Sequence, residues 1–196
     1  MRTKSCVTIT ALFTLCILFN APCPLMAQSM PAPADVPVRL AAPQASPAEV
    51  YAKLFSSQEG EVVSAAEAMP ADKYNFVPTH GTFEGVRTFG QQVTNIASSQ
   101  YYYFGDFGIK PGSDPDAIDK LTKKDDIVKA FKDSYAFANQ AIETITVENA
   151  FKQFGDDKIT RAGMAANGLA HTNDHYGQMV VYLRMNGIIP PASRKP

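Results

Sequence analysis

Cysteine is scarce in this chain of 196 residues, and tryptophan is absent altogether. The three cysteines, Cys6, Cys16 and Cys23, all lie near the N-terminus, so the rest of the chain can form no disulfide, thiolate nucleophile or cysteine-rich zinc site. The sequence also has no serine nucleophile elbow, no phosphate-binding glycine loop and no pair of catalytic carboxylates. These absences leave the three histidines of the chain as the main candidates for chemistry.

Segment 1–27 has the pattern of a secretory signal peptide. Two basic residues precede an apolar run at positions 7–19, and small or apolar residues follow as far as Ala27. The apolar run is too short to favour a membrane span. We therefore predict cleavage after Ala27 and a periplasmic or secreted protein without a membrane span. Lipid attachment at Cys23 is the alternative, which Pro22 disfavours because a small residue is expected there.

The charge and composition of the remaining chain restrict its partners and its domain organisation. Removal of residues 1–27 takes away two basic and no acidic groups, which changes the formal net charge from −1 to −3. This mild acidity argues against nucleic acid or an anionic membrane as the main partner. Residues 28–45 are rich in proline and alanine and are predicted to form a disordered linker. The predicted domain spans residues 46–191, and residues 192–196 are a tail.

The domain is predicted to be all-α, a four-helix bundle, because apolar residues recur at helical spacing and no alternating strand pattern or internal repeat appears. Ser46 and Thr88 are placed as N-caps of the first two helices, and Gly187 ends the last. Segment 146–154 is expected to form an extra turn or the end of the third helix. The predicted helices span about residues 46–69, 88–104, 122–145 and 160–185.

Two of the three histidines, His171 and His175, lie four residues apart in the last predicted helix. Because an α-helix has 3.6 residues per turn, both imidazoles project from one face and can share one cation. By itself, this spacing more often belongs to a solvated or hydrogen-bonded pair of histidines than to a metal site. A catalytic zinc or nickel site normally has three protein ligands and one open position, so a third ligand must come from elsewhere in the chain.

Three segments resemble the DinB-like superfamily of small metal-binding four-helix proteins. They are MPADKYNFVPT at 69–79, VRTFGQQVTNIASSQYYYF at 86–104 and HTNDHYGQMVVYLRMNGIIPP at 171–191, and they stand in the order and spacing of that family. The resemblance covers roughly residues 46–191. It implies a bundle fold and one divalent cation, with two ligands from the last helix and a third from the second.

The resemblance implies that His171 and His175 are the two ligands from the last helix. The position of the third histidine is occupied by Asn95, followed by isoleucine and alanine. An amide oxygen is a poorer ligand for zinc or nickel than an imidazole, so the site is expected to be weaker, more open or absent. His80, in the loop before the second helix, is an alternative third ligand that flexibility of the loop would have to bring to the cation.

Three further residues are predicted to surround the metal site. Gln178 and Tyr182 follow His175 at one and two turns and are expected to donate or accept hydrogen bonds that orient the imidazoles. Tyr102 lies on the Asn95 side of the second helix, together with Gln92 and Ser99, and is a candidate pocket wall.

Two functions are compatible with this sequence. The first is an exported metal-dependent hydrolase that acts on an unknown small molecule with a histidine pair and an asparagine. Thiol-dependent transfer, also implied by the resemblance, is disfavoured by export because the thiols concerned are cytoplasmic. The second is a non-catalytic helical bundle with a degenerate metal site that binds a ligand or a partner. A homodimer is compatible with either function.

Overall fold

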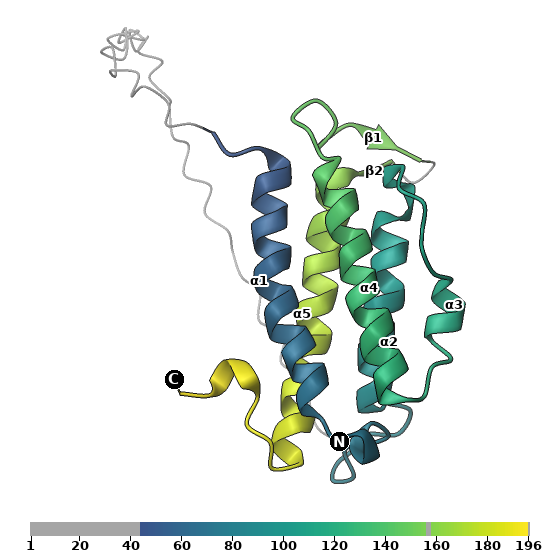
Figure 1. Ribbon diagram of the computed structural model, residues 1–196, viewed down its shortest axis with the longest axis vertical. Helices are drawn as coiled ribbons and strands as arrows, with labels where there is room; N and C mark the ends of the chain where they lie inside the picture. Colours follow the sequence, from purple (N-terminus) through teal and green to yellow (C-terminus); the bar gives the residue numbers. More distant parts are fainter. Residues whose placement is uncertain (1–43, 156–157, 196) are drawn as a thin grey trace, which may run out of the picture. The chain divides into compact units, whose positions relative to one another are not determined.

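The computed structural model describes residues 44–155 and 158–195, and four long helices account for most of them (Figure 1). The predicted signal peptide and nearly all of the predicted linker lie outside these residues. The predicted all-α bundle is confirmed, and each of the four helices is found within a few residues of its predicted bounds. The helices are α1 (Pro47–Ala68), α2 (Phe89–Phe104), α4 (Lys124–Glu143) and α5 (Arg161–Met185).

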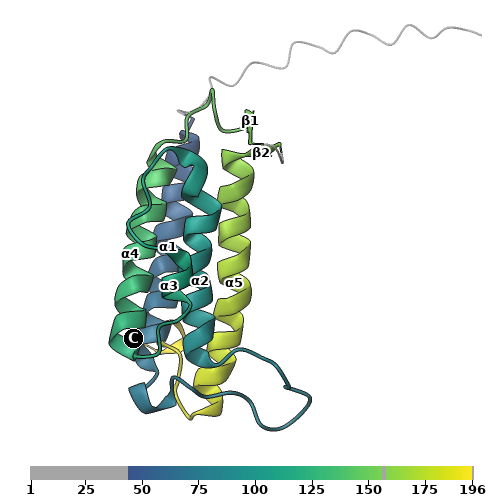
Figure 2. The same cartoon turned by 90° about the vertical axis from the view of Figure 1, so that its right-hand side faces the viewer.

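Helices α2 and α4 run in the same direction, and α1 and α5 run in the opposite one (Figures 1 and 2). Helix α2 packs against α4 and α5, and α1 packs against the same two helices. The parallel course of α2 and α4 requires a long return connection, which contains the short helices η2 (Gly105–Phe107) and α3 (Pro115–Ile118). Helix α3 lies against the outside of α2, and the connection returns the chain to the end of the bundle at which α2 begins.

The predicted N-caps of α1 and α2 are both confirmed, and each belongs to a capping box. The Ser46 hydroxyl accepts a hydrogen bond from the Glu49 backbone N–H at 3.2 Å, and the Glu49 carboxylate accepts one from the Ser46 backbone at 2.6 Å. Thr88 and Gln91 make the equivalent pair at the start of α2. The Thr88 capping box fixes where α2 begins, and therefore which residues of its polar face meet α5.

The structure differs from the sequence prediction in a short antiparallel strand pair before α5. Strands β1 (Gln153–Phe154) and β2 (Ile159–Thr160) pair in the register Gln153 with Thr160 and Phe154 with Ile159. Two residues per strand are too few to produce a visible alternation of apolar and polar residues, so the sequence did not reveal this pair.

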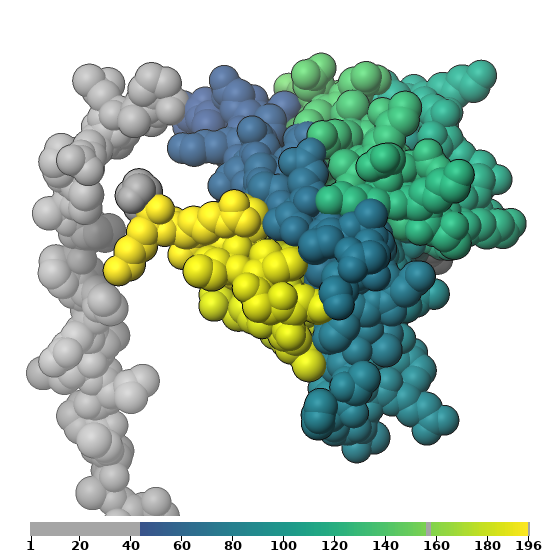
Figure 3. Space-filling model, turned by 60° about the horizontal axis from the view of Figure 1, so that its bottom comes forward, coloured from purple at the N-terminus to yellow at the C-terminus, as the bar shows by residue number. Residues whose placement is uncertain are grey.

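Two further short helices lie near one end of the bundle. Helix η1 (Ala71–Lys73) follows α1, and helix η3 (Pro191–Ser193), at the start of the predicted tail, contacts α1. The loop between η1 and α2 projects from the end of the bundle where α5 finishes (Figures 2 and 3).

Within residues 44–155 and 158–195, each helix is either too short or too polar to span a bilayer.

The interior contains an apolar core interrupted by a small polar group, which we call the core cluster. The core cluster consists of one residue from each long helix: Gln58, Gln100, Tyr135 and Thr172. The Tyr135 hydroxyl donates to the Gln58 side-chain oxygen at 3.4 Å, and the Gln100 amide donates to the Thr172 hydroxyl at 3.5 Å. Gln58 also donates to the Leu169 carbonyl at 3.0 Å. The core cluster thus ties all four long helices together.

Candidate functional site

The two histidines of α5 face α2 in the middle of the bundle. Their ring centroids are 4.5 Å apart with the ring planes nearly perpendicular. His175 is 4% exposed and His171 is half-buried. The arrangement is therefore that of a buried pair against α2, in which both imidazoles have lost much of their contact with water.

A row of side-chain hydrogen bonds holds His175 in place, and we call it the amide relay. Nδ1 of His175 lies 2.5 Å from Oε1 of Gln92, whose Nε2 donates to Oε1 of Gln178 at 2.9 Å. Nε2 of Gln178 in turn donates to the Asp174 carboxylate at 3.2 Å. Gln178, which was predicted to orient an imidazole, therefore reaches His175 only through Gln92. Sequence reasoning placed Gln92 on the Asn95 side of α2 but gave it no role.

The amide relay determines which nitrogen of His175 carries the proton. An ionised carboxylate only accepts hydrogen bonds, so Gln178 must turn its NH₂ group toward Asp174 and its oxygen toward Gln92. Gln92 must then present its own oxygen to His175. Nδ1 of His175 is consequently the donor, and Nε2 keeps its lone pair. This is the tautomer that a histidine needs in order to bind a metal through Nε2.

Both histidines are held in the neutral form at neutral pH. Burial, together with the nearby His171 and Arg87, lowers the pKa of His175 to about 4, against the opposing charge of Asp174. Burial also lowers the pKa of His171, although the Asn95 backbone partly offsets this effect. Nε2 of His171 is buried and has no hydrogen-bond partner among the described residues. A buried imidazole nitrogen without a partner has a desolvation cost that a bound cation or ligand would relieve.

The third predicted ligand, Asn95, is half-buried on α2 beside this pair. Asn95 lines a pocket together with Arg87, and a hydrogen bond to its backbone raises the pKa of His171 against the effect of burial. His80 is exposed and pairs with the Thr79 hydroxyl at 3.2 Å. No group of three or more His, Cys, Asp or Glu side chains suited to a metal occurs in the described part of the chain. Among the described residues, the pair therefore offers two imidazole donors, and Asn95 on α2 is the nearest predicted addition to them.

The two tyrosines of the predicted surroundings lie apart from the imidazoles. The Tyr182 hydroxyl donates to the Arg87 backbone carbonyl at 3.0 Å, which anchors the loop before α2 onto α5. Tyr102 is 73% exposed, whereas its neighbour Tyr103 packs against the His171 ring with centroids 5.6 Å apart. The sequence prediction chose Tyr102 because it lies on the same side of α2 as Asn95, but it is Tyr103 that contacts a histidine.

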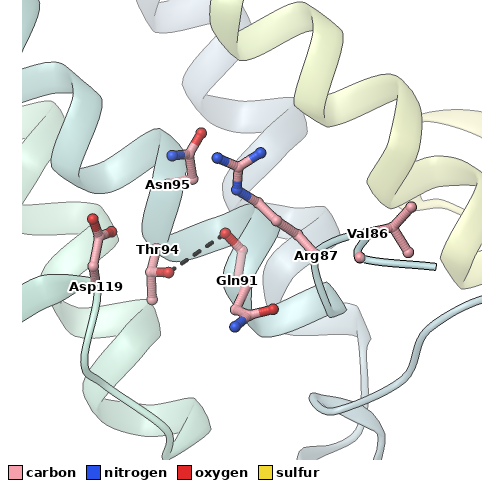
Figure 4. A pocket seen from close by; sticks show the side chains of 7 residues that line it. Val86, Arg87, Gln91, Thr94, Asn95 and Asp119 are labelled. Carbon is pink, nitrogen blue, oxygen red and sulfur yellow. Dashed lines mark hydrogen bonds between the residues drawn. The ribbon is translucent and has the colours of Figure 1, made fainter. Parts of the chain in front are cut away.

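A pocket of about 420 Å³ lies between the start of α2, the preceding loop and the end of α3. It reaches Asn95, whose backbone lies close to His171, but its lining includes neither histidine. Its size lies in the range of small-molecule sites. The Arg87 guanidinium extends toward Asn95, and Asp119 lies at the opposite side of the pocket, next to Thr94 (Figure 4). The side chains that line it are mainly polar: Arg87, Gln91, Thr94, Asn95 and Asp119, together with Gly85 and Val86. Sequence reasoning identified only Asn95 among them.

Comparison with known proteins agrees with this architecture. The family model of the DinB superfamily matches residues 54–179. The chain belongs to the DinB superfamily. The predicted resemblance is therefore confirmed, and the matched segment includes Asn95 and both histidines of α5.

A solved structure has the same fold. The crystal structure of a DinB-like protein from Bacillus cereus ATCC 10987 superposes with a TM-score of 0.62 at 14% sequence identity, over 72% of this chain and 93% of that one. No curated protein matches the sequence. At this level of identity the likeness shows the fold alone, so the function has to be argued from the site.

Proposed function

We propose that this DinB-superfamily protein is an exported metal-dependent hydrolase that acts on a small polar molecule. The observation that carries the proposal is the pair of neutral imidazoles on α5, one with Nε2 freed by the amide relay and the other with Nε2 buried and without a partner. Nε2 of His175 is in the state that a borderline metal such as zinc or nickel requires, and Nε2 of His171 makes no hydrogen bond within the described residues that would compete with a metal. His171 and His175 would be the main ligands, with Asn95 as the third.

A bound divalent cation would supply Lewis-acid activation of water or of a substrate carbonyl. The protein contributes three things to such a reaction. The amide relay keeps Nδ1 of His175 protonated and fixes the ring, and burial keeps the pair neutral at pH 7. The pocket next to Asn95 offers room for a polar substrate.

The alternative, a non-catalytic bundle with a degenerate metal site, also has an observation in its favour. The described residues bring no third imidazole, thiolate or carboxylate to the histidine pair. Arg87 adds a positive charge close enough to lower the pKa of both histidines, and the same charge opposes a bound cation. Under this alternative the pocket would still bind a ligand, but no water would be activated.

Metal analysis of four proteins separates the two functions. Zinc, nickel and manganese contents and affinities are measured for the wild type, His175→Ala, Asn95→His and the control Gln140→His, which places a histidine on the exposed face of α4. A stoichiometric metal in the wild type that is lost in His175→Ala supports the hydrolase. A metal-free wild type that gains a metal only in Asn95→His refutes the hydrolase and supports the degenerate site.

A further inference from the structure

The pocket that Arg87 and Asn95 line has opposite charges at its two sides. Arg87 reaches in from the loop before α2, and Asp119 lies at the end of α3 (Figure 4). The ion pairs among the described residues are Lys129 with Asp133 and Lys132 with Glu67, so neither Arg87 nor Asp119 is neutralised by a protein partner there. Both side chains are exposed and free to meet a ligand.

The backbone that carries Arg87 is fixed although its side chain is exposed. The Tyr182 hydroxyl holds the Arg87 carbonyl at 3.0 Å, and the capping box of Thr88 follows directly in sequence. A planar guanidinium offers a bidentate site for a carboxylate, which is the strongest type of charge-assisted hydrogen bond available to a side chain. Because the backbone is already fixed, binding does not have to order the loop that carries this side chain.

The opposite side of the pocket accepts hydrogen bonds. The Asp119 backbone is held at the end of α3, where its N–H donates to the Pro115 carbonyl at 3.1 Å. Beside it, the Thr94 hydroxyl donates to the Gln91 carbonyl at 3.4 Å, which leaves the lone pairs of that hydroxyl available. A carboxylate next to a hydroxyl acceptor suits an ammonium group.

We propose that this pocket binds a small zwitterionic molecule, with its carboxylate on Arg87, its ammonium group on Asp119 and its body over Thr94 and Asn95. Amino acids and short peptides have this chemistry. The proposal deepens the proposed function by naming the substrate class, and it rests on that function only for the claim that the bound molecule is a substrate. Binding itself is argued from Arg87 and Asp119 and needs no bound metal, although the pocket includes Asn95, the proposed third metal ligand.

Titrations of the metal-free protein, followed by ¹⁵N–¹H spectra at the Thr94 and Asn95 amides and the Arg87 side chain, test this proposal. The probes are alanine, alanyl-alanine and trialanine, which span three separations of the charges. The best of these is then compared with its N-acetyl derivative, which lacks the ammonium, and with its C-terminal amide, which lacks the carboxylate. We expect either blocked form to bind about tenfold more weakly, as loss of one charge-assisted hydrogen bond implies.

Two variants assign each charge to its partner. In Arg87→Gln the preference for the free carboxylate over the amide should disappear, and in Asp119→Asn the preference for the free amine over the acetylated form should disappear. The controls Lys53→Gln and Asp116→Asn, which change exposed charges that do not line this pocket, should keep both preferences. Unchanged dispersion of the spectra shows that each variant is folded.

The outcomes separate this proposal from the proposed function. Failure of all three probes to shift the pocket signals, or equal binding of free and blocked forms, overturns the zwitterion site whatever the metal content. Selective binding without hydrolysis by the metal-loaded protein keeps the zwitterion site and refutes the hydrolase for this class of substrate. Hydrolysis of the probe that is lost in His175→Ala supports both.

Discussion

The bundle contains two buried groups of polar side chains, which meet α5 at neighbouring positions. One is enclosed in the interior, and the other reaches the surface. The core cluster, to which Thr172 contributes, is enclosed by all four long helices. The amide relay, which starts at His175, runs outward along α2 and α5 to the exposed Asp174. The core cluster uses its hydrogen bonds to hold helices together, whereas the amide relay uses them to set the state of one imidazole. Buried polar groups therefore join helices in one region and fix the tautomer of an imidazole in the other.

The largest expected difference between the two regions concerns pH. Because the folded-state pKa of His175 is about 4 and an exposed histidine has a pKa near 6.5, the unfolded chain binds the proton more readily between these values. The contribution of His175 to the free energy of unfolding should be fully present above pH 6.5. The free energy of unfolding should then fall by roughly 3 kcal/mol as the pH drops to 4. Urea unfolding of the metal-free protein across this range measures it.

The control for the pH effect is His175→Gln, which keeps an amide donor for Gln92 but does not titrate. Its stability should fall less over the same range, and the difference from the wild type isolates the histidine from the carboxylates that also titrate near pH 4. Identical curves for the two proteins would contradict the buried neutral state of His175.

The next largest effect is expected from Gln58→Met in the core cluster. Methionine keeps the volume but leaves the buried Tyr135 hydroxyl without its acceptor and the Leu169 carbonyl without its extra donor. Unsatisfied buried groups of this kind cost about 2–3 kcal/mol in the free energy of unfolding. The exposed Gln140→Met on the surface of α4 should cost almost nothing. Loss of zinc affinity in Gln58→Met would show that the two regions are not separate.

Replacement of Gln92 by leucine should weaken zinc binding by about 10- to 100-fold with a smaller loss of stability, because removal of a group that orients a metal-binding histidine has effects of this order. Gln100→Leu is a matched control, since both glutamines lie on α2 and both are 1% exposed. Gln100 belongs to the core cluster, so its replacement should leave zinc affinity unchanged. Equal losses in the two variants would show that burial, and not the hydrogen bond to His175, is what matters.

The smallest expected effect is that of Asp174→Asn. An asparagine amide can either donate or accept, so the fixed direction of the amide relay is lost while its geometry is kept. The ¹⁵N shifts of the His175 ring should change from a single Nδ1-protonated form toward a mixture of tautomers, and zinc affinity should fall only severalfold. Asp133→Asn, which breaks a surface ion pair on α4, should leave the ring unaffected. An unchanged tautomer in Asp174→Asn would contradict the argument that the carboxylate sets the direction.

The sequence was informative wherever a feature depends on neighbours in the chain. The capping residues Ser46 and Thr88, the period of the apolar residues and the spacing of His171 and His175 are all local, and each was found as predicted. The short strand pair was missed because two residues carry no period. The arrangement of the helices in a bundle was predicted from this period and from the segments that resemble the DinB superfamily.

The site was predicted in part, because its remaining members meet only after folding. The one-turn spacing on the last helix linked Gln178 to His175, but Gln92 lies 86 positions before Gln178 and nothing in its local sequence links it to either residue. Arg87 and Asp119 come from different connections and line one pocket only because α3 folds back against α2.

The sequence by itself determined that this chain forms a helical bundle of the DinB superfamily with two histidines on one face and an asparagine in place of a third. The tertiary structure decided that this face is turned toward α2, that the imidazoles are neutral, and that Nδ1 of His175 carries the proton. The physical reason is that burial and hydrogen-bond direction set the state of an imidazole. Both depend on side chains that only the packing of α2 against α5 brings together.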